Sequence, residues 1–301
     1  MHRRTFLAGV SALFAGCSGR EDSDVIRPTV TPVEVPADPR ADGDAVPIGG
    51  SRFGDDVPGP DGVLCFHRLD RFEQAYVAPS RERFSVENPV GWMYVTNDGT
   101  TDLAIGTGWD LLKYSGHRWV PINAPQVGGS EISVLRPGER WRRVHVVQRV
   151  FGLPVLGPGR YVRVESIRIQ NEGQPRSVGA MFEVSETQFR MVPQREPTER
   201  GDDLIRIETR QRAELELVFE RVENTADGVE LVPEAIGAIP MFRDSIPRLR
   251  DVSIVRFRTT SADAAFTYLD AATARDEPVG PGDPLVVGDV SFTVRIAERN
   301  R

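Results

Sequence analysis

The chain has 301 residues, a formal net charge of −7 and 40% hydrophobic residues. This length allows about two domains, and the hydrophobic content is sufficient for a packed core, which excludes wholesale disorder. A net acidic chain without a basic cluster interleaved with aromatic residues is a poor nucleic-acid binder, so no nucleic-acid partner is expected. The 23 prolines and 28 glycines indicate many turns, as in mainly β proteins.

The first seventeen residues have the order of an export signal. Arg3 and Arg4 precede a short apolar run over 6–15, and two small residues precede Cys17. The apolar run is too short to cross a bilayer, so we interpret residues 1–16 as a signal peptide. An uncleaved anchor helix is the alternative.

These residues also resemble two known export motifs. The pair Arg3 and Arg4, followed by Phe6 and Leu7, resembles a twin-arginine signal, which implies export of the folded protein. The sequence Phe-Ala-Gly-Cys that ends at Cys17 resembles a lipobox, which implies lipid attachment at Cys17. We therefore expect the protein to lie on the extracytoplasmic face of the cell membrane, with membrane lipid as a partner through Cys17.

The basic residues are almost all arginine. Lys113 is the only lysine, and 36 of the 37 basic residues are arginine. Low lysine content with an acidic excess resembles the composition of proteins from halophilic archaea, although a GC-rich genome also favours arginine. Removal of residues 1–16 takes away two arginines and leaves a net charge of about −9.

Residues 17–47 predict a disordered tether on the lipid anchor. Residues 18–47 contain five prolines and five aspartates, which favour an extended and self-repelling chain. Such a tether would hold the folded part about 30–60 Å from the membrane. We interpret residues 48–77 as a lead-in segment.

Residues 78–186 predict one β-sandwich domain. Residues 92–96 form a strand rich in aromatic and β-branched residues, and Asn97-Asp98-Gly99-Thr100 predicts a hairpin turn. Ser115-Gly116 predicts a second turn. Two Pro-Gly corners follow at 136–139 and 157–160. The closing strands are expected at 161–164 and 180–184.

The order of these motifs is similar to that of bacterial immunoglobulin-like domains found in secreted lipoproteins. The motifs are Thr96-Asn97-Asp98-Gly99, Leu111-Leu112-Lys113, Trp119-Val120-Pro121, Leu135-Arg136-Pro137-Gly138-Glu139, Leu156-Gly157-Pro158-Gly159-Arg160-Tyr161 and Met181-Phe182-Glu183-Val184. They are turn and core positions over roughly a third of the chain, so the resemblance implies an immunoglobulin-like β-sandwich but no shared catalytic residues.

The remainder, 200–301, predicts a second β-rich or α+β domain. Residues 213–219 and 292–296 alternate between apolar and polar residues, as in half-solvated antiparallel strands. Between them, the spacing predicts a helix over 262–273 that is capped at Thr260-Ser261. The fold class we expect is therefore mainly β. The prolines and charged residues of 193–203 indicate the join between the two domains.

The two cysteines predict a protein without an internal disulfide. With lipid on Cys17, Cys65 has no partner in the chain. Its apolar neighbours Val63, Leu64 and Phe66 predict a buried small hydrophobe, and a reactive thiol is the alternative.

The sequence contains no motif of known catalytic or metal chemistry. His-Glu-x-x-His, Cys-x-x-Cys, Gly-x-Ser-x-Gly and phosphate-loop motifs are all missing, so no catalytic residue, metal or cofactor is expected. His67, His117 and His145 are isolated, which favours packed or surface histidines over metal ligands. Trp109 and Trp141 are flanked by charged residues and could form a surface contact, although sandwich aromatics more often belong to the core.

Two functions fit this sequence. The favoured one is a membrane-anchored extracytoplasmic lipoprotein that acts as a non-catalytic binding or structural module of the cell envelope, with an envelope protein or glycan as partner. The alternative is an extracytoplasmic hydrolase or ligand-capturing protein with its site in 200–301. Its carboxylates would come from Glu208, Glu214, Glu216, Asp244, Asp251 and Asp263.

Overall fold

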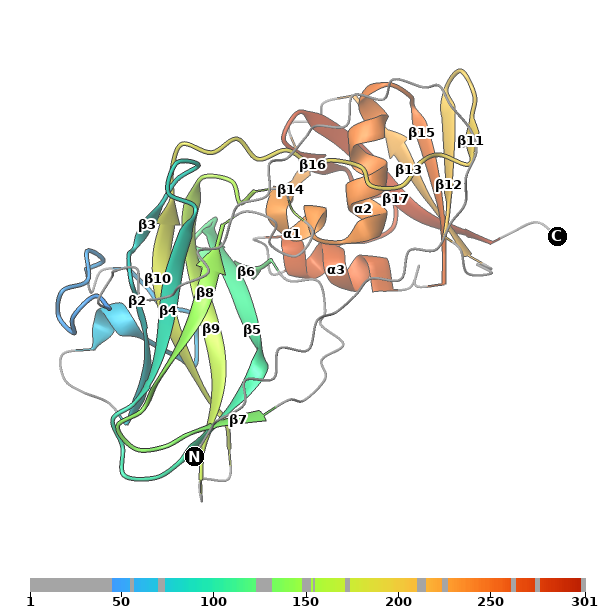
Figure 1. Cartoon of the computed structure of the whole chain (residues 1–301). Helices are drawn as coiled ribbons and strands as arrows, with labels where there is room; N and C mark the ends of the chain where they lie inside the picture. Colours follow the sequence, from blue (N-terminus) through green and yellow to red (C-terminus); the bar gives the residue numbers. More distant parts are fainter. Residues whose placement is uncertain are drawn as a thin grey trace, which may run out of the picture. The chain divides into compact units, whose positions relative to one another are not determined.

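The computed structural model describes residues 45–54, 57–69, 74–122, 132–147, 153, 155–170, 174–209, 215–223, 227–260, 264–273 and 277–298. Residues 41–301 cluster as one compact unit, and the described strands form three sheets (Figure 1). The mainly β fold that the sequence predicts is confirmed. Arg3, Arg4, Phe6, Leu7 and Cys17 lie outside the described residues.

The first and second sheets form the N-terminal β body. The first sheet has the order β1-β10-β9-β5-β6, with β3 beside β10 and β7 beside β5; the second has the order β2-β4-β8. The first contains β1 (Val63–Cys65), β3 (Arg83–Phe84), β5 (Leu103–Ser115), β6 (Arg118–Pro121), β7 (Ile132–Leu135), β9 (Gly159–Ile169) and β10 (Arg176–Val184). The second contains β2 (Ala75–Pro79), β4 (Val90–Asn97) and β8 (Arg140–Val146).

Residues 161–165 of strand β9 are buried on both faces of the sheet. Tyr161 and Ile167 point toward the second sheet, whereas Val162 and Val164 point to the opposite face, and all four are less than 10% exposed. The outer face around Val162 and Val164 is covered by residues that precede β2, whereas Ser166 and Arg168 further along the strand are exposed.

Part of the segment 48–77 is built into the sheets. Strand β1 lies parallel to β10, and β2 pairs with β4. Phe53, Val57 and Cys65 pack with Val162 in a small apolar cluster on the outer face of the first sheet. The structure therefore extends the folded body upstream of residue 78. The 3₁₀ helix η1 (Phe66–Arg68) follows β1 directly.

The turn at residues 97–100 does not make the hairpin that the sequence predicts. Strand β4 belongs to the second sheet and β5 to the first, so the chain changes sheets here. The buried Asn97 side chain donates to the carbonyl oxygens of Thr101 and Leu135, each at 2.9 Å, and accepts from the Gly99 amide at 3.1 Å. The Asn97 side-chain amide therefore holds the corner at which the chain passes from the second sheet to the first. In a simple hairpin this side chain would be left without these partners.

The second predicted turn is a two-residue hairpin. Strands β5 and β6 pair antiparallel, with Ser115 opposite Arg118. Gly116 and His117 both have positive φ angles, 55° and 67°, which is the twist that a two-residue hairpin loop requires.

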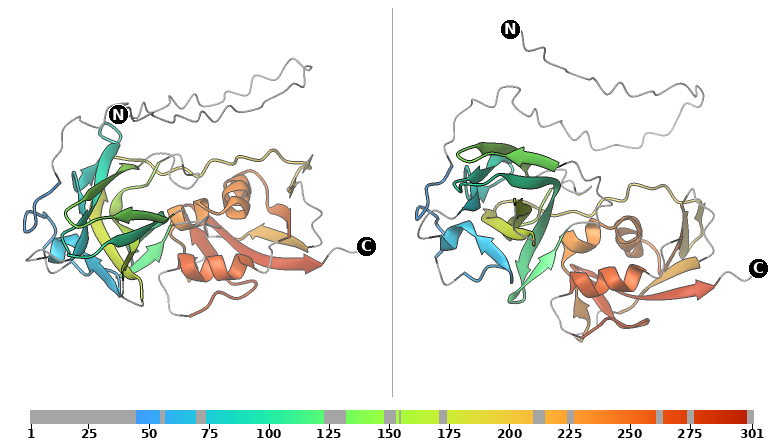
Figure 2. Two further views of the ribbon diagram at one scale, coloured as in Figure 1. Left: turned by 60° about the horizontal axis from the view of Figure 1, so that its bottom comes forward. Right: turned by 90° about the horizontal axis from the view of Figure 1, so that it is seen from below.

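The third sheet has the order β11-β12-β15-β13-β17-β16-β14, and its helices cover one face (Figures 1 and 2). Its strands are β11 (Glu199–Arg200), β12 (Leu204–Glu208), β13 (Leu215–Arg221), β14 (Val229–Glu230), β15 (Ile254–Thr259), β16 (Leu285–Val287) and β17 (Val290–Glu298). The helices are α1 (Pro233–Gly237), α2 (Pro240–Ser245), the 3₁₀ helix η3 (Ile246–Arg250) and α3 (Ala264–Ala272). The Phe219 ring of β13 packs edge to face against Phe242 of α2, with 5.9 Å between the ring centroids. The helices therefore cover the face of the sheet on which Phe219 lies.

Helix α3 agrees with the helix that the sequence predicts over 262–273. Ala265 and Leu269 are fully buried on one face, and Phe266 packs against the same core. The capping residue Ser261 and Ala262 lie outside the described residues.

The segment that joins the two predicted domains is pinned to the third sheet's helices. The buried carboxylate of Asp244 on α2 accepts the Gln194 amide at 2.7 Å and lies 3.3 Å from Nε of Arg195. Arg248 donates to the Arg195 carbonyl oxygen. These contacts hold the segment as an extended strap rather than as a free linker.

The only lysine of the chain makes a buried ion pair with α1. Lys113 of β5 places Nζ 2.6 Å from Oε1 of Glu234, and the two side chains are 14% and 1% exposed. The Tyr161 hydroxyl also donates to this oxygen, at 3.1 Å. Burial and the Glu234 carboxylate raise the pKa of Tyr161, which keeps the phenol protonated as a donor.

We expect Lys113→Met to destabilise the protein by about 3 kcal/mol, because it leaves the buried Glu234 carboxylate without its cation. Denaturant unfolding measures the change. Arg295→Gln is the control: it removes one partner of an exposed ion pair with Glu220, which contributes less than about 1 kcal/mol. Equal effects of the two substitutions would contradict a structural role for the Lys113 pair.

Candidate functional site

The outer face of the second sheet carries two arginines stacked on aromatic rings. Arg142 lies over Trp92 with Cζ 4.5 Å from the ring centroid, and Arg140 lies over Tyr94 at 5.5 Å. Each arginine stacks diagonally, because Arg142 is opposite Tyr94 in the ladder and Arg140 is opposite Thr96. Stacking orders both side chains while leaving their N–H groups available to an anion.

Neither of these two guanidiniums is neutralised by a carboxylate of the described residues. This distinguishes them from Arg143 of β8 and Arg163 of β9, which both form ion pairs with Glu165. The nearest acidic residue along β8, Glu139, uses its carboxylate to accept the Arg136 amide at 2.8 Å and so holds the preceding turn. Two ordered arginines on one strand, without a carboxylate partner among the described residues, have the chemistry that binding of an anion requires.

The inner face of β8 is fixed by a buried ionic cluster. The Glu165 carboxylate of β9 accepts Arg143 Nη1 at 2.9 Å and Arg163 Nε at 2.9 Å. Arg143 also donates to the Gly106 carbonyl oxygen of β5, and Arg163 to the Val144 carbonyl oxygen of β8 at 3.1 Å. Burial raises the pKa of Glu165, and the two guanidiniums oppose this shift. The cluster therefore ties β8 to the first sheet on the side opposite the stacked arginines.

His145 follows in the same buried layer. It is 1% exposed and packs against Phe84 at 5.2 Å and Phe182 at 4.5 Å between ring centroids. Burial and the charge of Arg163 hold the pKa of His145 well below 6.5, so the ring is neutral. This is a packed histidine, as the sequence predicts for the isolated histidines.

Trp109 and Trp141 are both half-buried and pack against the core. Trp109 lies under Arg163 at 4.2 Å, and Trp141 lies under Arg143 at 4.1 Å. The structure thus places their rings beside the buried ionic cluster rather than together on an open surface. The stacked arginines Arg140 and Arg142 were missed as a pair in the sequence, although their alternation with Trp141 along a strand is the signal.

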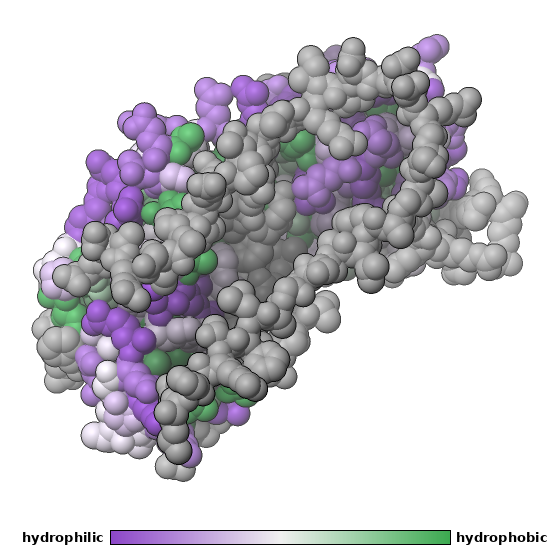
Figure 3. Space-filling view, in the orientation of Figure 1, coloured by the Kyte–Doolittle hydropathy of each residue, from purple (hydrophilic) through white to green (hydrophobic). Residues whose placement is uncertain are grey.

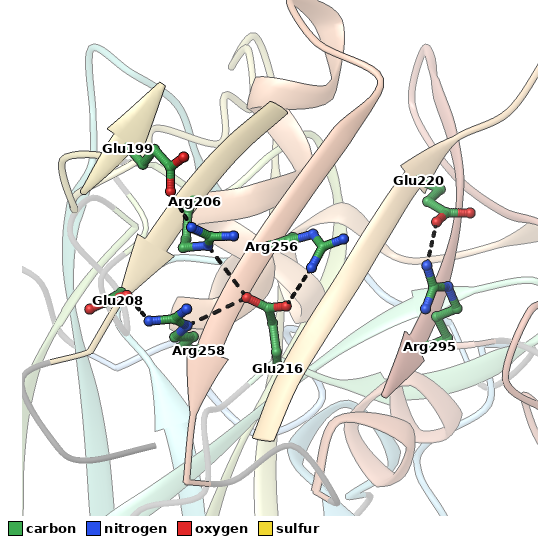
Figure 4. A network of polar contacts seen from close by, with 8 residues as sticks. All are labelled: Glu199, Arg206, Glu208, Glu216, Glu220, Arg256, Arg258 and Arg295. Carbon is green, nitrogen blue, oxygen red and sulfur yellow. Dashed lines mark hydrogen bonds and ion pairs between the residues drawn. The ribbon is translucent and has the colours of Figure 1, made fainter. Parts of the chain in front are cut away.

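Two carboxylates of the alternative enzyme hypothesis belong to an arginine–glutamate lattice on the open face of the third sheet (Figure 4). Glu216, 12% exposed, lies between three guanidiniums: Arg256 at 3.0 Å, Arg258 at 3.5 Å and Arg206 at 3.7 Å. Glu208 pairs with Arg258 as well. Both carboxylates are neutralised by arginines, whereas Asp244 is on α2, on the opposite, helix-covered side of the sheet.

The remaining candidates do not complete such a site. Asp251 follows η3, and Glu214 and Asp263 lie outside the described residues. Within the described residues, no group of three or more His, Cys, Asp or Glu side chains is placed to hold a metal ion. Cys65 is 1% exposed, and burial raises its pKa to about 12, which agrees with the predicted buried hydrophobe.

No family model matches this chain, and no curated protein matches it. None of the helices in the described part of the chain is long and apolar enough to span a membrane.

We expect the stability of the protein to fall as the pH drops below about 6.5. The unfolded chain binds a proton at His145 near pH 6.5, whereas the folded chain does so only at lower pH. The contribution of the neutral His145 to the free energy of unfolding is therefore fully present above pH 6.5. Below that pH it falls by up to about 1.4 kcal/mol per pH unit.

Denaturant unfolding of His145→Leu at several pH values between 5 and 8 tests this expectation, and the variant should lose that part of the slope. His117→Asn, in the exposed turn where asparagine tolerates positive φ, should keep the slope. An unchanged slope in His145→Leu would refute the assignment.

We expect Glu216→Ala to destabilise the protein by about 2 kcal/mol, because three arginines then lose their shared carboxylate. Glu220→Ala is the matched control on the same strand: its side chain is 37% exposed and has one partner, so the loss should stay below about 1 kcal/mol. Thermal or denaturant unfolding measures both, and equal losses would contradict the central place of Glu216.

Proposed function

We propose that this protein is exported and anchored by lipid on Cys17 to the extracytoplasmic face of the cell membrane, where it acts as a non-catalytic binding or structural module of the envelope. The observation that carries the proposal is the order of the first seventeen residues: paired arginines, a short apolar run and small residues before Cys17. The proline- and aspartate-rich segment that follows supports a tether.

The binding surface in this proposal is the arginine–aromatic face of β4 and β8. Its support is the pair of ordered, unpaired guanidiniums of Arg140 and Arg142, held from behind by the buried Glu165 cluster. On the face drawn in Figure 3, the described residues are mostly hydrophilic and the hydrophobic ones form small separate patches, which favours recognition through polar groups.

We also propose that the N-terminal β body is an immunoglobulin-like sandwich. Two sheets that bury a common core support this proposal, together with the chain's passage between sheets after β4 and again between β7 and β8. Rigid sandwiches of this kind bind through surface strands and loops, which is the mode expected for a non-catalytic module.

Cys17→Ala tests the anchor. We expect the variant to leave the membrane fraction, whereas the parent chain stays with membranes after a salt wash, because lipid attachment does not depend on ionic contacts. Replacing Arg3 and Arg4 by lysine should block export through a twin-arginine route. A Cys17→Ala protein that still sediments with salt-washed membranes would overturn the proposal.

A further inference from the structure

Strand β8 has a free edge beside its stacked arginines. It is the last strand of the second sheet, with β4 as its only ladder partner in the described residues. The Glu139 carbonyl oxygen accepts the Asn97 amide at 3.1 Å, and the Val147 amide donates to the Pro89 oxygen at 3.0 Å. These bonds show that the backbone N–H and C=O groups of the odd-numbered residues of β8 face β4, because such groups alternate between the two edges of a strand.

The backbone N–H and C=O groups of Arg140 and Arg142 therefore face away from β4. The open part of this edge ends at Val144, whose carbonyl oxygen accepts Nη1 of the buried Arg163. Next to its beginning lies a surface hollow of about 390 Å³, lined by Ser133, Val134, Leu135, Glu139, Arg140 and Trp141. No other described residue pairs with these backbone groups, so the edge offers donors and acceptors next to open space.

We propose that the free edge of β8 is a docking strand for an extended acidic segment of the protein's envelope partner, which adds to the second sheet with carboxylates opposite Arg140 and Arg142. This inference rests on the proposed binding function, because it names the chemistry of that partner. Strand addition supplies main-chain hydrogen bonds for affinity, and the side chains supply specificity.

The spacing of the two arginines matches such a segment. Residues 140 and 142 lie about 7 Å apart on one face of the strand, and an extended peptide places its alternate side chains at the same interval. A neighbouring strand runs about 4.8 Å away, so carboxylates on alternate residues come within reach of both guanidiniums. An extended acidic peptide can therefore form main-chain hydrogen bonds with β8 and, in the same alignment, place its carboxylates beside both arginines.

The charge around the edge is consistent with an acidic partner. The Glu139 carboxylate is engaged by the Arg136 amide, and Asp98 interacts with the Tyr76 side chain. The net negative charge of the whole chain acts over longer distances, which salt screens beyond about 10 Å at 0.1 M ionic strength. A polyanion without a peptide backbone would use the guanidiniums alone, so the unpaired edge favours a protein segment over a glycan.

Fluorescence anisotropy with a labelled synthetic peptide of alternating Glu and Val tests the inference on the full-length chain carrying Cys17→Ala. We expect saturable binding in about 0.1 M salt, with affinity reduced at least about tenfold in Arg140→Gln/Arg142→Gln. The matched control is Arg81→Gln/Arg168→Gln, which removes two exposed arginines that make no ion pair with a described residue; its affinity should stay within about twofold. Circular dichroism checks that each variant is folded.

The same peptide with every second amide N-methylated, made in both registers, separates strand addition from simple charge attraction. At least one register should lose binding at least about tenfold, because it blocks the donors that face β8. Binding of both methylated peptides as tight as that of the unmethylated peptide, an unaffected arginine double variant or no binding of the parent peptide would each overturn the inference. Since binding is measured in solution, these outcomes are independent of the membrane-fractionation test of Cys17.

Discussion

The N-terminal β body depends on one buried carboxylate that serves two arginines from opposite sheets. Glu165 is fully buried on β9, and it accepts hydrogen bonds from Arg143 of β8 and Arg163 of its own strand. Each guanidinium also donates to one backbone oxygen of the facing sheet, Arg143 to Gly106 and Arg163 to Val144. Removing one partner of such a buried charge cluster would leave an uncompensated buried charge, so these bonds link the two sheets strongly. Because Arg143 points inward, Arg140 and Arg142 alternate outward, so the face with the stacked arginines lies on the opposite side of β8 from this cluster.

The same arrangement, in which one carboxylate is shared by several arginines, recurs in the rest of the chain. Asp244 meets Arg195 and the strap backbone, and Glu216 meets three guanidiniums on the open sheet face. Arginine suits this role because its planar group has five donors, which can reach a carboxylate and a carbonyl at once. On the third sheet the arginine stems have a second effect. Val218 is opposite Arg256 on one side and Arg295 on the other, and it is only 1% exposed on a face that no other sheet of the described residues covers.

Local patterns in the sequence predicted local structure well. The hairpin at Gly116-His117, helix α3 and the burial of Cys65 each depend on neighbours within a few residues. The corner at Asn97 was predicted as a hairpin, because its turn residues are the same in both cases and the deciding contact, the Leu135 oxygen, comes 38 residues later. For the candidate site the limit was similar. The charged residues around Trp141 indicated a surface, but the inward turn of Arg143 depends on Glu165, which lies 22 residues further along the chain. Partners that are distant in sequence cannot be read from composition or spacing, whereas alternation along β8 could have separated the two faces.

The single lysine is a natural target for chemical labelling. Amine-specific reagents have one side-chain target in the 301 residues, Lys113, and the 36 arginines do not react with them. Its ammonium is held by the buried Glu234 carboxylate, and acylation requires the group to release its proton and leave that partner. The rate at which Lys113 is labelled therefore reports how often its ammonium leaves Glu234, so the opening of this internal contact can be followed in the unmodified protein without introducing a probe.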